Sequence, residues 1–364
     1  MKKIFVVIFL TITILWSCSW QEKEESFSFY IATDVHMTKQ TPDYTNLCFQ
    51  KSILPNIKED SSGLGKFIII TGDMDPFSRV KESIEKVLGK NYRFYPVIGN
   101  HDVGMTNNKY KEYPEGNWCN TFDIVNNNKE NLKNIVNWGP SYPTLSSDSI
   151  IYIDTITGKK YISTYDSENI LGSKYTTYSF DEGNSHFVVL DIYSGIKCFK
   201  ARHFGRISNE LYNWLAKDLD KTKKENIFVF AHQPIQYEPG GGKYHLLVNE
   251  AYKIFCKDSA RSYGADSLVW FNKEYTQKVK SRNEFWELLK KHNVVAYFCG
   301  HSHHHSEKKY DGVWEINMET GAWNIEGRSR YGKILVDKNN VVLNVMGFKA
   351  DPARFELINK IKLK

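Results

Sequence analysis

The 364-residue sequence lacks several features that mark large classes of proteins. Its longest apolar run, Ile4–Leu15, spans twelve residues and is interrupted by two threonines, so it is too short to cross a bilayer. There is no internal repeat and no stripe of basic residues, and Lys and Arg exceed Asp and Glu by only 48 to 42. Nucleic-acid binding is therefore disfavoured, because nucleic-acid binders concentrate positive charge on one face.

Closely paired cysteines are also missing. None of the six cysteines shows the short spacing of a zinc ribbon or a redox motif; they are Cys18, Cys48, Cys119, Cys198, Cys256 and Cys299. Without Cys18 the number is odd, so even a compartment that permits disulfides does not require them here. The apolar fraction of 41% and the charged fraction of 25% are instead those of a folded globular protein.

The N-terminus carries an export pattern. Two lysines precede the apolar run, and Leu15–Cys18 follows it, which predicts a signal peptide over residues 1–17. Residues Leu15–Cys18 resemble the lipobox of bacterial lipoproteins, in which the cysteine becomes the acylated first residue of the mature protein. We therefore expect a secreted protein, lipid-anchored through Cys18 to the outer membrane on its periplasmic or outer side, with residues 18–26 as a polar tether. An ordinary cleaved signal with a chance cysteine is the alternative.

Strand and helix patterns alternate along the rest of the chain, which predicts an α/β domain over residues 27–350. Two amphipathic stretches are expected helices, Ser208–Thr222 and Ser281–His292. Two irregular stretches, about 104–175 and about 236–280, interrupt the rhythm; the first is expected to form loops and hairpins. Short antiparallel strands are expected after residue 313, followed by a basic tail at 351–364. Six apolar runs are expected strands: Phe27–Ala32, Phe67–Ile70, Phe94–Ile98, Phe187–Leu190, Ile227–Phe230 and Val294–Phe298.

Residues of the types that bind metal ions come immediately after five of these strands. They are Asp34 and His36, then Asp73, then Asn100 and His101, then His232, and last His301 and His303. Because ligand sites in α/β sheets form beyond the carboxyl ends of the strands, we expect these side chains to meet. A single histidine would not indicate a metal site. Five strands that each end in residues of these types do indicate one.

The series Asp-x-His, Gly-Asp, Gly-Asn-His-Asp, His and Gly-His-x-His, in this order, resembles the calcineurin-like metallophosphoesterase superfamily. The resemblance runs from about Phe27 to about Phe348. It implies a β-sandwich of two packed mixed sheets flanked by helices, with the metal site at the carboxyl ends of the strands. It also implies hydrolysis of phosphate monoesters or diesters by a hydroxide that bridges two metal ions.

The resemblance implies a role for each motif residue. One ion would be held by Asp34, His36, Asp73 and His303. The other would be held by Asp73, Asn100, His232 and His301. Asp73 would bridge the two ions, and His101 would stand beside them as proton donor. Imidazole and carboxylate ligands favour Mn, Zn or Fe over Ca or Mg.

Departures from related families narrow the function. Ser/Thr protein phosphatases have Arg where this chain has Ile98, so a protein-phosphatase role is disfavoured. Purple acid phosphatases have a Tyr ligand where it has Pro76, so a ferric centre with a Tyr ligand is disfavoured. Asp75 and Asp102 are both candidates to orient His101, and local hydrogen bonding to turn amides is the alternative for either.

The expected partner is a small phosphate ester, with the membrane contacted only through the lipid anchor. Two other functions stay open: a non-catalytic binding lipoprotein on the same fold, and a nuclease of the same superfamily. The complete ligand set speaks against the first, and the weak net charge of +6 speaks against the second. The organic part of the substrate, the preference for mono- or diesters, the metal and the oligomeric state are left open.

Overall fold

The expected strands form within two residues of their predicted bounds. The protein is described by a computed structural model for residues 26–37, 39–41, 44–45, 48–102, 118–140, 150–153, 160–163, 175–193, 205, 207–236, 282–321, 329–349 and 354–364. The six strands are β1 (Phe27–Ala32), β4 (Phe67–Ile70), β5 (Arg93–Pro96), β10 (Ser185–Val189), β11 (Asn226–Phe230) and β12 (Ala296–Cys299). All are almost wholly buried, as expected for β-branched and aromatic runs in a sheet covered on both faces.

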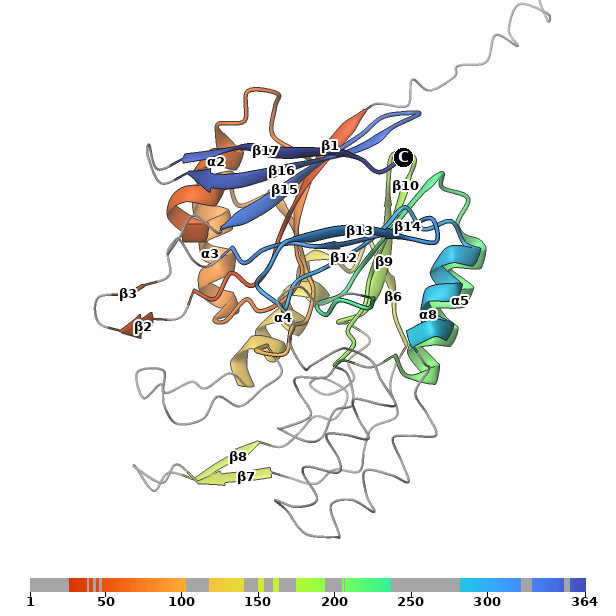
Figure 1. The fold of residues 1–364 in the computed structure, drawn as a ribbon. Coiled ribbons are helices and arrows are strands. Elements are labelled where there is room, and N and C mark those ends of the chain that lie inside the picture. The colour runs from red at the N-terminus through yellow and green to blue at the C-terminus, as the bar shows by residue number, and fades with distance from the viewer. Residues whose placement is uncertain are drawn as a thin grey trace, which may run out of the picture.

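The strands assemble into two mixed sheets that pack face to face (Figure 1). The first sheet has the order β17-β16-β15-β1-β4-β5, with β15 (Arg330–Val336), β16 (Val341–Lys349) and β17 (Arg354–Lys362). The second has the order β13-β14-β12-β11-β10-β9-β6, with β6 (Asn137–Trp138), β9 (Tyr178–Glu182), β13 (Ser306–Tyr310) and β14 (Val313–Asn317). Two separate hairpins pair β2 (Lys39–Thr41) with β3 (Tyr44–Thr45), and β7 (Ile150–Ile153) with β8 (Lys160–Ser163).

Parallel pairing within each sheet decides where the site lies. Strands β1, β4 and β5 are parallel neighbours in the first sheet, and β10, β11, β12 and β14 are parallel neighbours in the second. The carboxyl ends of each parallel set therefore share one edge of the sheet. The two-sheet α/β architecture expected from the sequence is confirmed.

Aromatic side chains fill the space between the two sheets. The ring of Phe29 on β1 lies 5.2 Å from that of Phe67 on β4, and 5.1 and 5.7 Å from Phe187 and Phe228 of the opposite sheet. All four are fully buried. Burial of each ring contributes about 1.5–3 kcal/mol, so this contact fixes the two sheets, and the strand ends they carry, against one another.

Helices cover the outer faces (Figure 1). The π-helical turn η1 (Phe49–Ile53), α2 (Leu54–Lys58) and α3 (Phe77–Leu88) lie beside the first sheet; α5 (Asn209–Lys221) and α8 (Arg282–Lys291) lie beside the second. Helix α5 begins where the sequence predicts, because the Oγ of Ser208 accepts a hydrogen bond from the backbone N–H of Leu211 at 3.1 Å. Among the described residues, the helices all fall short of the length and apolarity that a bilayer span requires.

Two segments differ from their prediction. Part of the first irregular stretch is helix α4 (Trp118–Asn131), which its asparagine-rich sequence does not favour. Tertiary contacts outweigh the poor propensity, since Ile124 is fully buried and the Asn128 amide donates to the carbonyl of Tyr175 at 2.8 Å. The expected basic tail is also corrected, because most of it forms β17 on the edge of the first sheet. The signal peptide, Cys18 and nearly all of the second irregular stretch lie outside the described residues.

A buried ion-pair network outside the strand-end site predicts a pH-dependent stability. His186 on β10 lies between two carboxylates, 2.7 Å from Asp181 and 2.9 Å from Asp218. Burial lowers the pKa of His186, but the two carboxylates outweigh it and raise the pKa to about 9, above the ordinary 6.5. The folded state therefore binds the proton more tightly than the unfolded state, so its stabilisation is complete below pH 6.5 and disappears as the pH rises towards 9.

His186 is expected to contribute about 2–3 kcal/mol to the fall in the free energy of unfolding between pH 6.5 and 9, so the fall in the variant His186→Gln should be smaller by about this amount. Urea titrations of both proteins at the two pH values measure it. The same fall in both proteins would show that His186 is not its source.

Candidate metal centre

All the predicted ligand residues lie at one edge of the sandwich. Asp34 and His36 follow β1, Asp73 follows β4 and Asn100 follows β5, all in the first sheet. His232 follows β11, and His301 and His303 follow β12, in the second sheet. Because the two sheets pack face to face with these ends together, loops from both converge on one cluster.

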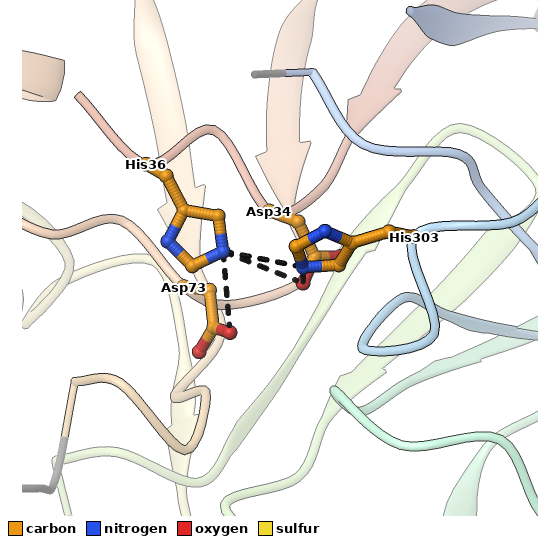
Figure 2. A group of neighbouring side chains, drawn as sticks. All are labelled: Asp34, His36, Asp73 and His303. Carbon is orange, nitrogen blue, oxygen red and sulfur yellow. Dashed lines mark hydrogen bonds and ion pairs between the residues drawn. The ribbon is translucent and has the colours of Figure 1, made fainter. Parts of the chain in front are cut away.

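The first group of ligands is formed by Asp34, His36, Asp73 and His303, whose ligand atoms all lie within 4.8 Å of one another (Figure 2). The Nε2 atom of His303 is 3.2 Å from Oδ1 of Asp34. The Nε2 atom of His36 is 3.3 Å from Nε2 of His303 and 3.7 Å from Oδ2 of Asp73. These are the four residues that the sequence assigns to one ion.

The second group is joined to the first through Asp73. The Oδ2 atom of Asp73, which faces His36, is also 3.3 Å from Nε2 of His232. The side-chain oxygen of Asn100 lies 3.0 Å from the same His232 nitrogen and 2.9 Å from Nδ1 of His301. One carboxylate oxygen therefore lies between the two groups, as a bridging ligand requires.

In both Asp34 and Asp73, one carboxylate oxygen accepts hydrogen bonds from the neighbouring loops and the other faces the histidines of the cluster. Oδ2 of Asp34 accepts hydrogen bonds from the backbone N–H of His301 at 2.9 Å and from the Thr33 hydroxyl at 2.7 Å. Oδ1 of Asp73 accepts from the backbone N–H of His101 at 2.8 Å. The other oxygens face imidazole nitrogens, with Oδ1 of Asp34 3.2 Å from Nε2 of His303. Carboxylate oxygens and imidazole nitrogens that face one another in this way are a donor set that fits a divalent cation.

The backbone of the cluster is strained. Within the described part of the chain, seven residues other than glycine have positive φ, and five of them are predicted ligands: Asp34, His36, Asp73, His301 and His303. Such conformations cost about 1–3 kcal/mol each and persist where the surrounding structure holds them, most often at functional sites. The strain therefore marks the same residues as the sequence motifs do.

Two glycines of the motifs are required by close approach. A Cβ atom at Gly300 would collide with the Thr33 hydroxyl and with Oδ2 of Asp34. A Cβ atom at Gly99 would collide with Oδ1 of Asp73. Each glycine thus lets a loop of one strand lie against the carboxylate of another.

The family model for calcineurin-like phosphoesterases matches residues 27–305. The chain belongs to this family. Its superfamily consists mostly of metal-dependent phosphoesterases, and the Asp/His cluster of this chain is consistent with a metal site.

Solved structures of similar fold span most of the chain at low identity. A dimetal phosphatase from Danio rerio is 13% identical, with 93% of this chain and 98% of that one covered and a TM-score of 0.47. GAP50, the anchor in the inner membrane complex of Plasmodium, is 14% identical (93% and 89% covered, TM-score 0.45). Vps29 with bound zinc from Entamoeba histolytica is 8% identical (93% and 99% covered, TM-score 0.34). The curated proteins give no match. Identities this low say nothing about substrate, so the function of this phosphoesterase-family chain must be argued from its site.

The carboxylates and histidines of the cluster shift one another's pKa strongly. Burial alone would raise the pKa of the Asp34 and Asp73 carboxyls, but neighbouring histidines hold both well below the ordinary range. Burial likewise lowers the pKa of His36 and His232, but the carboxylates outweigh it and raise these values to about 10 and about 9. A metal ion binds the deprotonated imidazole, so an ion that bound at these histidines would displace their protons.

The two carboxylates proposed to orient His101 have different surroundings. Asp102 accepts hydrogen bonds from the backbone N–H groups of Gly99, Asp73 and Met74 at 2.8–3.0 Å, so it ties the loops after β4 and β5 together. The Asp75 carboxylate lies 2.6 Å from Nδ1 of His36, with a nitrogen of His101 within 4.8 Å. Only the bond from Gly99 is the local turn bonding that the sequence left as an alternative, because the other two bonds come from the loop after β4.

Two residues that the sequence analysis missed lie at the cluster, one beside a predicted ligand and one beside the residue between two predicted ligands. The Nε2 atom of Gln233, next to His232, lies 3.2 Å from Nε2 of His301. The Asn317 amide donates at 2.8 Å to the hydroxyl of Ser302, between the last two ligand histidines. Asn317 is the last residue of β14, the parallel neighbour of β12, and it pairs in register with Cys299. A polar residue at the carboxyl end of a mostly apolar strand is the sequence signal that could have identified it.

Proposed function

We propose that this protein hydrolyses phosphate esters, mono- or diesters, with two divalent ions held at the carboxyl ends of its strands. The observation that carries the proposal is the shared oxygen of Asp73, 3.7 Å from His36 and 3.3 Å from His232. One ion position is formed by Asp34, His36, Asp73 and His303. The other is formed by Asp73, Asn100, His232 and His301. When bound, Mn, Zn or Fe ions supply Lewis acidity and a bound water of lowered pKa.

The chain's own residues would supply charge balance and a proton. Asp34 and Asp73 bring two negative charges against the four of two divalent ions, so the loaded site is positive and attracts an anionic phosphate. His101 lies beside His36, with ring centroids 4.8 Å apart, and it is partly exposed, as are His301 and His303. A protonated His101 at the rim would donate a proton to the alkoxide that leaves.

Turnover of p-nitrophenyl phosphate and bis-p-nitrophenyl phosphate by the metal-free protein, with and without added Mn²⁺ or Zn²⁺, tests the proposal. Metal-dependent hydrolysis of either ester supports it, and the ratio of the two rates gives the ester preference. A protein that binds the ions but hydrolyses neither ester, nor any member of a panel of phosphorylated metabolites, would be a binding protein on this fold. Cleavage of DNA or RNA in preference to small esters would identify a nuclease.

We also propose that the enzyme is exported and anchored through lipid on Cys18. The support is the sequence pattern of residues 1–18 alone. The variant Cys18→Ser is expected to move the protein from the detergent phase to the aqueous phase, or to leave the precursor uncleaved, since stable anchoring needs two or more acyl chains. Phase partition of bacterial extracts measures this, and identical partition of both proteins would refute the anchor.

A further inference from the structure

Asp75 is not among the predicted ligands but contacts one of them. It lies two residues after Asp73 in the loop between β4 and α3, and only 4% of it is exposed. Its Oδ1 atom is 2.6 Å from Nδ1 of His36. The other ring nitrogen of His36, Nε2, faces the cluster, 4.0 Å from Oδ1 of Asp34 and 3.7 Å from Oδ2 of Asp73. The ring is thus held between Asp75 on one side and the predicted ion position on the other.

The contact selects one form of the imidazole ring. Neutral imidazole has a single N–H, and a carboxylate at Nδ1 keeps the hydrogen there. The lone pair of Nε2 is then left for a metal ion, and the ring is prevented from rotating away.

The ligand histidine of the second group is secured differently. Nδ1 of His232 donates to the backbone carbonyl of Thr71 at 2.7 Å. A backbone carbonyl is neutral and is retained in any side-chain substitution, whereas the partner of His36 is a charged side chain. Of these two histidines, His36 is therefore the one whose ring orientation a side-chain substitution, at Asp75, can remove.

We propose that Asp75 is a positioning residue that orients His36 and thereby sets the ion affinity of the first group, without binding the ion itself. The inference rests on the two-ion site of the proposed function. It departs from the sequence expectation, which gave Asp75 as a partner of His101 or of turn amides. The second group should be insensitive to Asp75.

The test is a Mn²⁺ titration of the metal-free full-length protein, with bound ion counted by equilibrium dialysis. In Asp75→Ala, one of the two ions is expected to bind about 10–100-fold more weakly and the other to keep its affinity. In Asp75→Asn the loss should be smaller, because the amide oxygen still accepts a hydrogen bond from Nδ1. Such partial rescue is expected of a residue that acts by accepting the hydrogen bond from Nδ1 of His36.

A matched control exists at the His186 network. Asp218 is also a buried carboxylate on a histidine, 2.9 Å from Nε2 of His186, but it belongs to α5 and has no contact with the predicted ligands among those described. Asp218→Asn should bind both ions as the wild type does. Circular dichroism checks the fold of each variant, and if Asp75→Ala does not fold, the Asn variant alone decides by a selective loss of one ion.

Three outcomes would overturn the inference. Unchanged affinity for both ions in a folded Asp75 variant would show that His36 needs no partner. Equal weakening of both ions would show a general effect on the loops. A third ion in the wild type that disappears in the variants would make Asp75 a ligand, together with His36 and His101. Failure of the wild type to bind any ion would instead refute the proposed function itself.

Discussion

Replacing Asp73 with Asn is expected to abolish phosphate ester hydrolysis and to release both ions. The Oδ2 atom of Asp73 is the one shared by the two ligand groups, 3.7 Å from His36 and 3.3 Å from His232. An amide at this position removes the negative charge that both ions would share. Since metal ions contribute several kcal/mol of transition-state stabilisation, turnover should fall on the order of 10³-fold or more.

The design of this substitution limits damage to the fold. The amide of Asn keeps an oxygen that accepts the backbone N–H of His101, as Oδ1 of Asp73 does at 2.8 Å. Metal content by mass spectrometry and turnover of p-nitrophenyl phosphate are measured on the same samples, with Asp218→Asn as the control for loss of a buried carboxylate. A variant that retained two ions and normal turnover would refute the bridging role.

Replacing His101 with Ala should have a different effect, because it removes a proton donor and leaves every ligand. The residue supports Asp73 through its backbone N–H, which Ala also has. Metal content should therefore be unchanged. Turnover of alkyl phosphates, whose leaving group needs protonation, should fall by about 10²–10⁴-fold. The fall should be smaller for nitrophenyl esters, whose leaving group is stable as an anion.

A series of esters with graded leaving-group pKa measures this effect. In the variant, the rate should depend more steeply on the leaving group than in the wild type. The control is His292→Ala, which removes a histidine of the loop after α8 that pairs with Asp220 at 3.5 Å. Equal losses across the ester series would show that His101 acts in some way other than as the acid.

Local sequence signals predicted the strands that build the site. Runs such as Phe67–Ile70 are short, wholly apolar and rich in β-branched or aromatic residues, so burial in a sheet is the state that best satisfies them. Ligand-type side chains at their carboxyl ends then predicted one cluster, because parallel strands bring these ends to one edge. Signals of this kind failed for α4 and β17, which depend on distant partners: Ile124 is buried in the core, and β17 pairs along its length with β16.

The sequence by itself determined the family and the candidate ligands, since the order and spacing of Asp34, Asp73, Asn100, His232 and His303 resemble those of calcineurin-like phosphoesterases. Only the tertiary structure decided how they are held. Positive φ at five ligands, the shared oxygen of Asp73 and the pairing of Asp75 with His36 arise where loops from two sheets meet. Contacts between residues 39 or more positions apart have no local pattern, because their distances are set by the packing of the sheets.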